Sequence, residues 1–229
     1  MCTTNFRDVL NSFHSGTFQV LDDTIPLEDY ISIDLSVTNK ALTKVDMSNP
    51  YEMDSYILDY LKGKKGKVAY GGYNEKRNLY KSSTIFDNHS SEARSVHLGV
   101  DFWAAEGTAI RAPLPGKIHS YKDNATSGDY GPTIILEHFF QDIQFYTLYG
   151  HLSKSSLENI YIGKNIALGA VFANLGTPEE NVNYAPHLHF QIIKDLQGFS
   201  GDYPGVCSEK ERAAYLKNCP DPNLLLKFK

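Results

Sequence analysis

Three short histidine patterns fall within one stretch of this sequence. They read HLGVD from His97 to Asp101, YGHL around His151, and HLHF beginning at His187 and including His189. Imidazole nitrogen and carboxylate oxygen are common zinc ligands, and a catalytic zinc site usually keeps three protein ligands and one open position. The spacing predicts a metal site made of His97, Asp101 and a histidine of the HLH pair. It leaves open whether both histidines of that pair are ligands or one is an acid/base group.

Alternating residues of a β-strand share a face, and this periodicity groups the residues of two patterns. If each pattern is a strand, His97 and Asp101 point to the same side, and His187 and His189 do so on their own strand. Gly99 lies between the first two and has no side chain, which leaves room for an ion and a substrate. We expect the apolar residues between these polar positions to form a core below the metal face: Leu98, Val100, Phe102, Leu188 and Phe190.

These patterns belong to a region in which short apolar runs alternate with Gly, Pro and Asn. Such runs are typical of strands separated by turns. The expected strands are 96–103, 108–112, 117–121, 133–138, 144–149, 170–175 and 187–193. The fold class is therefore predicted to be mainly β, with an antiparallel β-sandwich or barrel-like core.

The segments before and after this region have different residue patterns. Ser48-Asn49-Pro50 precedes an apolar stripe of Met53, Ile57, Leu58 and Leu61, which predicts a capped helix, and 67–70 reads as a strand. Residues 73–95 are polar and loop-like, and they show no pattern that indicates chemistry. Ser208 and Glu211 form a capping box that predicts a helix to about residue 217. We therefore divide the chain into a mixed α+β N-terminal region (1–86), the β core (87–197) and a helical extension packed on it (198–229).

The composition excludes some functions. The 229 residues have a formal net charge of −5, and the basic run KGKKGK at 62–67 is interpreted as a solvated loop, so no nucleic-acid partner is expected. No window approaches the roughly 18 apolar residues of a membrane span. The first residues lack an apolar signal segment, so a cytoplasmic protein is expected, or a periplasmic or secreted one if the chain was trimmed. Cys2, Cys207 and Cys219 are predicted to be free thiols, with a Cys207–Cys219 bridge as the minor alternative.

The motifs HLGVDF, YGHLS and HLHFQI, in that order, resemble the lysostaphin/LytM-type zinc metallopeptidases. The stretch GTAIRAPLPG at 107–116 also resembles the hairpin that follows the first motif in that family, and the resemblance extends over about 94–193. It implies the duplicated hybrid motif fold and one zinc ion per chain, bound by His97, Asp101 and His189. It also implies that His151 and His187 are catalytic. His138 is assigned a structural role, whereas the histidines at 14, 89 and 119 look isolated.

The family implies hydrolysis of peptide bonds in peptidoglycan or in glycine-containing peptides. The sequence has no HExxH motif, so the proton-transferring groups must be His151 and His187, in an order that the sequence leaves open. The GDYPGV and CPDPNLLL stretches resemble a subgroup found fused to aminotransferase-type and phosphotransferase-type domains, which puts peptidoglycan in doubt. Two alternatives therefore stay open: a cytosolic zinc hydrolase of a small amide, and a non-catalytic binding module on the same fold. The oligomeric state is not predicted.

Overall fold

The computed structural model describes residues 5–13, 19–77, 94–140 and 142–228. The strands are β1 (Tyr30–Ser32), β2 (Val68–Gly71), β3 (Arg94–His97), β4 (Val100–Trp103), β5 (Ala109–Arg111), β6 (Gly116–Asn124), β7 (Gly131–Phe140), β8 (Ile143–Gly150), β9 (Asn165–Ile166), β10 (Val171–Asn174), β11 (His187–Ile193) and β12 (Val206–Ser208). The helices are α1 (Phe6–Ser12), α2 (Pro50–Lys64), α3 (Arg212–Asn218) and α4 (Asn223–Leu226), with 3-10 turns at Leu27–Asp29, Lys40–Lys44 and Lys154–Leu157.

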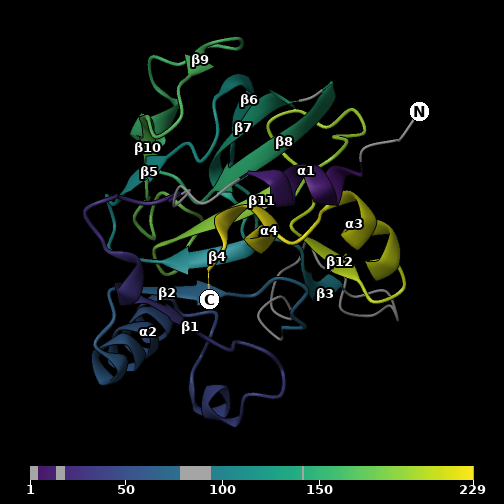
Figure 1. The fold of residues 1–229 in the computed structure, drawn as a ribbon. Helices are drawn as coiled ribbons and strands as arrows, with labels where there is room; N and C mark the ends of the chain where they lie inside the picture. The colour runs from purple at the N-terminus through teal and green to yellow at the C-terminus, as the bar shows by residue number, and fades with distance from the viewer. Residues whose placement is uncertain (1–4, 14–18, 78–93, 141, 229) are drawn as a thin grey trace.

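One eight-stranded sheet organises the molecule, in the order β1-β2-β4-β11-β8-β7-β6-β9. Its neighbours are antiparallel except for the parallel pair of β1 and β2. The pairs β10·β5 and β12·β3 lie outside it (Figure 1). The mainly β fold class is confirmed. Within the described ranges, however, the strands form a mixed open sheet and no closed barrel.

The strand expected over 96–103 is in fact two strands in two different sheets. β3 pairs with β12, whereas β4 pairs with β2 and β11. The chain changes direction at Leu98 and Gly99, where the Leu98 amide donates to the carbonyl of Gly205 at 2.9 Å. A Cβ atom on Gly99 would lie 2.7 Å from the ring of His189, so only glycine lets this turn pass so close to that side chain.

The main core lies on one face of the large sheet and confirms the expected alternation. Leu188 and Phe190 of β11 and Phe102 of β4 are fully buried in one cluster, which α1 and α4 also enter from the side seen in Figure 1. Leu98 is buried in a second cluster under β3 and β12. Because β11 has a period of two, its histidines must point to the face opposite the main core.

Helix α2 packs on the edge of the sheet that is formed by β1 and β2 from the N-terminal region. Asn49 caps it by accepting hydrogen bonds from the amides of residues 51 and 52, and Pro50 occupies the first turn. Its buried face consists of Met53, Ile57 and Leu61, which pack with Ala69 and Trp103 in a third cluster. Leu58, expected in the same stripe, is 57% exposed, because one residue after Ile57 the helix has already turned by about 100°.

The C-terminal extension differs from its prediction in one respect. The capping-box contacts form, since the Ser208 hydroxyl donates to the Glu211 carboxylate at 2.8 Å and accepts from the Glu211 amide at 3.3 Å. The α-helix begins only at Arg212, because Ser208 still belongs to β12. Cys207 and Cys219 are buried free thiols, so the alternative bridge is not formed; Cys2 lies outside the described residues. Among the described helices, none has the length and apolar character to cross a membrane.

Candidate metal centre and active site

Strand pairing brings the three sequence motifs together. In the antiparallel pair of β4 and β11, Asp101 lies opposite His189, and Trp103 lies opposite His187. On its other side, His189 lies opposite Gly150, the residue before His151. Because the neighbours of His189 along β11 are buried in the main core, its side chain points to the opposite face.

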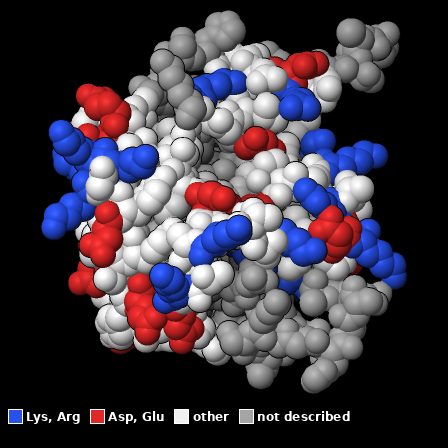
Figure 2. All heavy atoms as spheres, turned by 90° about the horizontal axis from the view of Figure 1, so that it is seen from below, with Lys and Arg blue, Asp and Glu red and all other residues white. Residues whose placement is uncertain are grey.

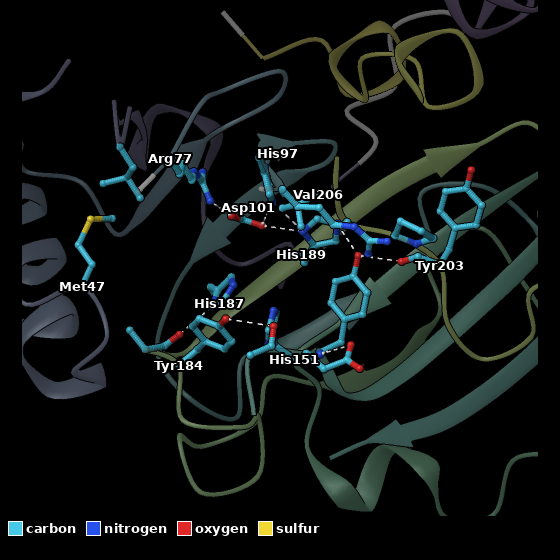
Figure 3. Close-up of a pocket in the computed structure, with 18 of the residues that line it drawn as sticks. Met47, Arg77, His97, Asp101, His151, Tyr184, His187, His189, Tyr203 and Val206 are labelled. Carbon is cyan, nitrogen blue, oxygen red and sulfur yellow. Dashed lines mark hydrogen bonds and ion pairs between the residues drawn. The ribbon is translucent and has the colours of Figure 1, made fainter. Parts of the chain in front are cut away.

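Three candidate ligand atoms converge at one point, as Figure 3 shows for His97, Asp101 and His189. His97 Nε2 is 2.9 Å from His189 Nδ1 and 3.2 Å from Asp101 Oδ1, and His189 Nδ1 is 3.1 Å from the same oxygen. All three side chains are 2% exposed. The cluster is therefore compact and shielded from bulk water.

Each imidazole of the cluster makes a hydrogen bond on the side away from the other candidate ligands. These bonds identify which nitrogen of His97 and of His189 faces into the cluster. His97 Nδ1 lies 3.0 Å from the carbonyl of Gly72, which can only accept, so Nδ1 carries the proton. His189 Nε2 lies 2.9 Å from Gln191 Oε1, and Gln191 donates its amide to the carbonyl of Pro204 at 3.2 Å, so this Nε2 carries the proton too. With their protons on these outer nitrogens, the rings in their neutral form direct two lone pairs at each other and at the Asp101 carboxylate oxygen. Such an arrangement is repulsive without a cation, and imidazole nitrogen and carboxylate oxygen are common ligands of a metal ion.

Burial controls the charge of this cluster. It lowers the pKa of His97 to about 4, which keeps the ring neutral and able to bind a metal near neutral pH. Burial alone would raise the pKa of the Asp101 carboxyl, but the guanidinium of Arg77 beside it holds that pKa well below its usual range. Asp101 is therefore a carboxylate.

His151 and His187 form a second pair of imidazoles beside the cluster (Figure 3). Their ring centroids are 4.1 Å apart. His187 Nδ1 donates to the carbonyl of Ala185 at 2.7 Å, and His151 Nδ1 faces the carbonyl of Asn181 at 3.4 Å. In both rings Nε2 is left as the acceptor. Burial lowers the pKa of both, and for His151 the neighbouring histidines lower it further, so both are neutral and able to accept a proton.

His151 has a left-handed backbone conformation, with φ of 62°. This region is uncommon for a residue with a side chain and costs on the order of 1–3 kcal/mol. Hydrogen bonds on both sides maintain it, since its amide donates to the carbonyl of Tyr130 at 2.9 Å and its carbonyl accepts from the amide of Gly176 at 3.0 Å. The conformation places the imidazole immediately after β8 and directs it towards His187.

All five predicted residues line one cavity of about 260 Å³. Sequence reasoning missed several others that line the same cavity, among them Arg77, Trp103, Tyr130 and Tyr184. Arg77 lies in the stretch 73–95, which is interpreted from the sequence as a loop without chemistry. Residues 73–77 are indeed outside the strands and helices but include this cavity residue, residues 94 and 95 belong to β3, and 78–93 lie outside the described residues. The lone position of Arg77 in a polar stretch gave no signal, and Tyr184 lies in the turn before HLHF. The described face in Figure 2 is hollowed near its centre, and its Lys and Arg residues are interspersed with acidic ones.

The remaining histidines lie elsewhere. His138 is buried in β7, where Nδ1 donates to the carbonyl of Pro115 at 2.9 Å and Nε2 lies 2.7 Å from the Thr147 hydroxyl. These contacts agree with a structural role. His119 contacts the Ser120 hydroxyl at 2.8 Å and does not line the cavity. The histidines at 14 and 89 fall outside the described residues.

Known proteins match the region that holds this site. Residues 95–200 match the model of Peptidase family M23. An uncharacterized metalloprotease of Haemophilus influenzae is 33% identical over 140 residues, which are 57% of this chain and 27% of that protein, so the chain spans about a quarter of its length. The catalytic domain of the antimicrobial peptidase lysostaphin from Staphylococcus simulans is 25% identical, with a TM-score of 0.41 over 62% of this chain and 88% of that one. A zinc containing peptidase from Vibrio cholerae is 22% identical, with a TM-score of 0.38 over 54% and 31% of the two chains. The resemblance found in the sequence is confirmed as a match of residues 95–200 to Peptidase family M23.

Proposed function

We propose that this chain is a zinc-dependent metalloendopeptidase that hydrolyses peptide bonds in peptidoglycan or in glycine-containing peptides. One observation carries the proposal. Two imidazoles and a carboxylate converge on a single point, and a second pair of imidazoles lies beside them in the same cavity. The family match over 95–200 and the metalloprotease name of the Haemophilus influenzae relative support a peptidase over other metal enzymes.

The residues fit one zinc ion per chain. The separations of 2.9 to 3.2 Å between the inward-facing atoms of His97, Asp101 and His189 are close to the edge, about 3.3 Å, of a tetrahedron with bonds of about 2.0 Å. When bound, the ion would supply a Lewis acid for the scissile carbonyl and a bound water with a pKa lowered towards about 7. Three protein ligands leave the fourth position for that water.

The second pair supplies proton transfer. His151 and His187 both present an unprotonated Nε2, so either can accept the proton of the attacking water. Once one ring is protonated, the other stays neutral, because two imidazolium ions with centroids 4.1 Å apart would repel each other. The protonated ring can then stabilise the tetrahedral oxyanion or donate to the departing amine. Because both rings present Nε2 as an acceptor, the order of the two roles stays open.

The test combines metal analysis with hydrolysis. The purified chain should contain one zinc ion, lose activity when the zinc is chelated and regain it when zinc is restored. Digestion of peptidoglycan and of a glycine-rich peptide is followed by mass spectrometry of the released fragments. Cleavage only of small amides would favour the small-amide hydrolase, and a zinc-replete chain that cleaves none of these would be a binding module.

A further inference from the structure

A buried arginine lies against the candidate metal ligand Asp101, and it comes from outside the family match. Arg77 is 3% exposed and follows β2 in the N-terminal region. Its Nη1 donates to Asp101 Oδ2 at 2.5 Å, and its Nε donates to Glu75 Oε2 at 2.6 Å. Figure 3 shows its side chain directed at Asp101 from the side opposite His189.

The two oxygens of Asp101 have different partners. Oδ2 faces Arg77, whereas Oδ1 is the oxygen 3.2 Å from His97 Nε2 and 3.1 Å from His189 Nδ1. We propose that Arg77 is a positioning residue that holds Oδ2, so that Asp101 presents Oδ1 alone to the metal. The inference rests on the zinc site of the proposed function and adds to it a residue that no motif contains.

Arg77 is itself held in place on several sides. Its amide donates to the carbonyl of Ser95 at 2.8 Å, and the His97 amide donates to the carbonyl of Glu75 at 2.9 Å, which joins this segment to β3. The second carboxylate oxygen of Glu75 accepts from the Leu35 amide at 3.1 Å. The guanidinium therefore approaches Asp101 from a fixed frame, as expected of a group that orients a metal ligand.

The backbone leaves room for this contact at one glycine. Gly72 has φ of 104°, a conformation that favours glycine, and its carbonyl accepts from His97 Nδ1 at 3.0 Å. A Cβ atom there would overlap the guanidinium of Arg77 and would lie 3.0 Å from His97 Nδ1. The segment from Gly72 to Arg77 thus supplies the outer partner of two ligands, His97 and Asp101, while Gln191 supplies that of His189.

The same guanidinium also reaches towards the catalytic pair. Arg77 Cζ lies 5.6 Å from the ring centroid of Trp103, and that ring stacks on His187 with centroids 5.6 Å apart and an angle of 19°. A planar fork can contact two carboxylates and an aromatic face together, which the ammonium of lysine cannot do. These three contacts explain why an arginine, and not a lysine, occupies position 77. The positive charge of Arg77, which disfavours a nearby cation, is offset by Glu75.

The experiment separates position from charge with a double variant. Arg77→Met removes the contact and one positive charge, whereas Glu75→Gln with Arg77→Met removes the contact and keeps the summed charge of the wild type. Arg111→Met is the matched control, because Arg111 pairs with Asp23 at 2.8 Å on β5, outside the cavity. Zinc affinity is measured by competition with a chromophoric chelator. The visible absorption of the cobalt(II) form reports the ligand arrangement, and circular dichroism checks folding.

Both Arg77 variants should bind zinc about 10- to 100-fold more weakly, as is typical when an outer partner of a ligand is lost, and their cobalt band should change. Arg111→Met should match the wild type in both. Native affinity and an unchanged band in the double variant would overturn the inference, even if Arg77→Met alone were weakened, because the effect would then be one of charge. If Arg77→Met fails to fold, Arg77→Lys replaces it, and native binding by that variant would also overturn the inference.

The outcomes distinguish this inference from the proposed function. A wild-type chain that binds zinc but cleaves no peptide would overturn the peptidase proposal, while the affinities of the variants would still decide the role of Arg77. A wild-type chain that binds neither zinc nor cobalt would overturn both. If peptide cleavage is found, kcat should fall in the double variant even at saturating zinc, because the Trp103 contact towards His187 is lost as well.

Discussion

β4 has two neighbours in the sheet, and they contribute to the site in opposite ways. β11 brings His187 and His189 directly into the cavity. β2 brings no ligand, but the segment that follows it, from Gly72 to Arg77, contacts the outer side of His97 and Asp101. The candidate ligands therefore come from strands within the region that matches Peptidase family M23, while two of them contact the N-terminal region on their outer side.

This difference separates the residues that would bind a metal from those that contact such a residue on its outer side, and the loss of each kind has a different expected effect. Removal of a ligand should abolish binding, whereas removal of an outer partner should weaken it by a moderate factor. Removal of a proton-transferring residue should leave binding intact. Variants of each kind therefore test the comparison, and loss of a ligand has the largest expected effect.

The largest effect is expected from loss of a ligand. His189→Ala and His97→Ala should each weaken zinc binding by more than about 100-fold, the upper end of the effect of an outer partner. Hydrolysis should fall to the level of the metal-free chain. Elemental analysis of the purified variants, with a parallel assay, measures both.

The control for these variants is the chelated wild type. Because the three ligands are attached to strands with their own buried core, the metal-free chain should keep its β circular-dichroism signal. Full zinc content in His97→Ala and His189→Ala would remove the site assignment. Unfolding on chelation would show instead that the metal builds the fold.

Loss of a proton-transferring residue should separate binding from turnover. His151→Ala and His187→Ala should keep their zinc, because neither ring takes part in the convergent cluster. Turnover should fall by about 10²- to 10⁴-fold, the usual contribution of a general acid or base. The same elemental analysis and peptide assay apply.

The two histidines of the HLH motif allow this test to show which of them binds zinc. His187 and His189 are two residues apart on the same face of β11, so spacing alone does not assign their roles. A zinc-depleted His187→Ala beside a zinc-replete His189→Ala would show that the assignment is reversed. Unchanged hydrolysis in both His151→Ala and His187→Ala would leave the pair without a catalytic role.

Much of the strand region was predictable, because its signals are local. β11 spans His187 to Ile193, the range that was predicted for it, and α2 begins directly after its Asn49 cap. The convergence of His97 and Asp101 was also foreseen, although by the wrong route. The chain bends at Gly99 instead of running straight, because this glycine has to pass the ring of His189, which is 90 residues away in sequence.

The rest of the site depends on contacts that no local pattern records. Arg77 reaches Asp101 across 24 residues, through the pairing of β2 with β4. Tyr130 is placed beside His151 and His189 by a loop before β7. A single Arg or Tyr in a polar stretch has the same appearance in a sequence whether it is solvated or buried against a ligand, so only the fold distinguishes the two cases.

The N-terminal region can be tested through its helix. Ile57 is 2% exposed and packs in the cluster that contains Trp103, so Ile57→Ala should lower the free energy of unfolding by about 2–5 kcal/mol. Leu58→Ala is the matched control, since Leu58 is 57% exposed and should change it by less than about 0.5 kcal/mol. Urea denaturation measures both. Equal effects of the two variants would mean that α2 does not pack on the sheet as described.

The smallest effect is expected at His138, which is as deeply buried as the histidines of the site but does not line the cavity. Burial lowers the pKa of His138 to about 4 from an ordinary value of 6.5, although its bond to the Pro115 carbonyl opposes the shift. Below pH 6.5 the unfolded chain gains a proton that the folded chain does not, so stability is full above pH 6.5 and falls as the pH drops towards 4. The loss attributable to His138 should reach about 2 kcal/mol at pH 5 and about 3 kcal/mol near pH 4.

His138→Met isolates this contribution, because methionine fills much of the same space and does not titrate. The variant should be less stable at pH 7, where it lacks the bond to Pro115, but it should lose about 2 kcal/mol less than the wild type between pH 7 and pH 5. Urea unfolding at several pH values in that range gives both curves, and the other histidines contribute equally to each. Parallel curves would show that His138 is protonated as readily in the folded chain as in the unfolded one. Diverging curves would show that deep burial in the eight-stranded sheet keeps His138 neutral without any metal nearby.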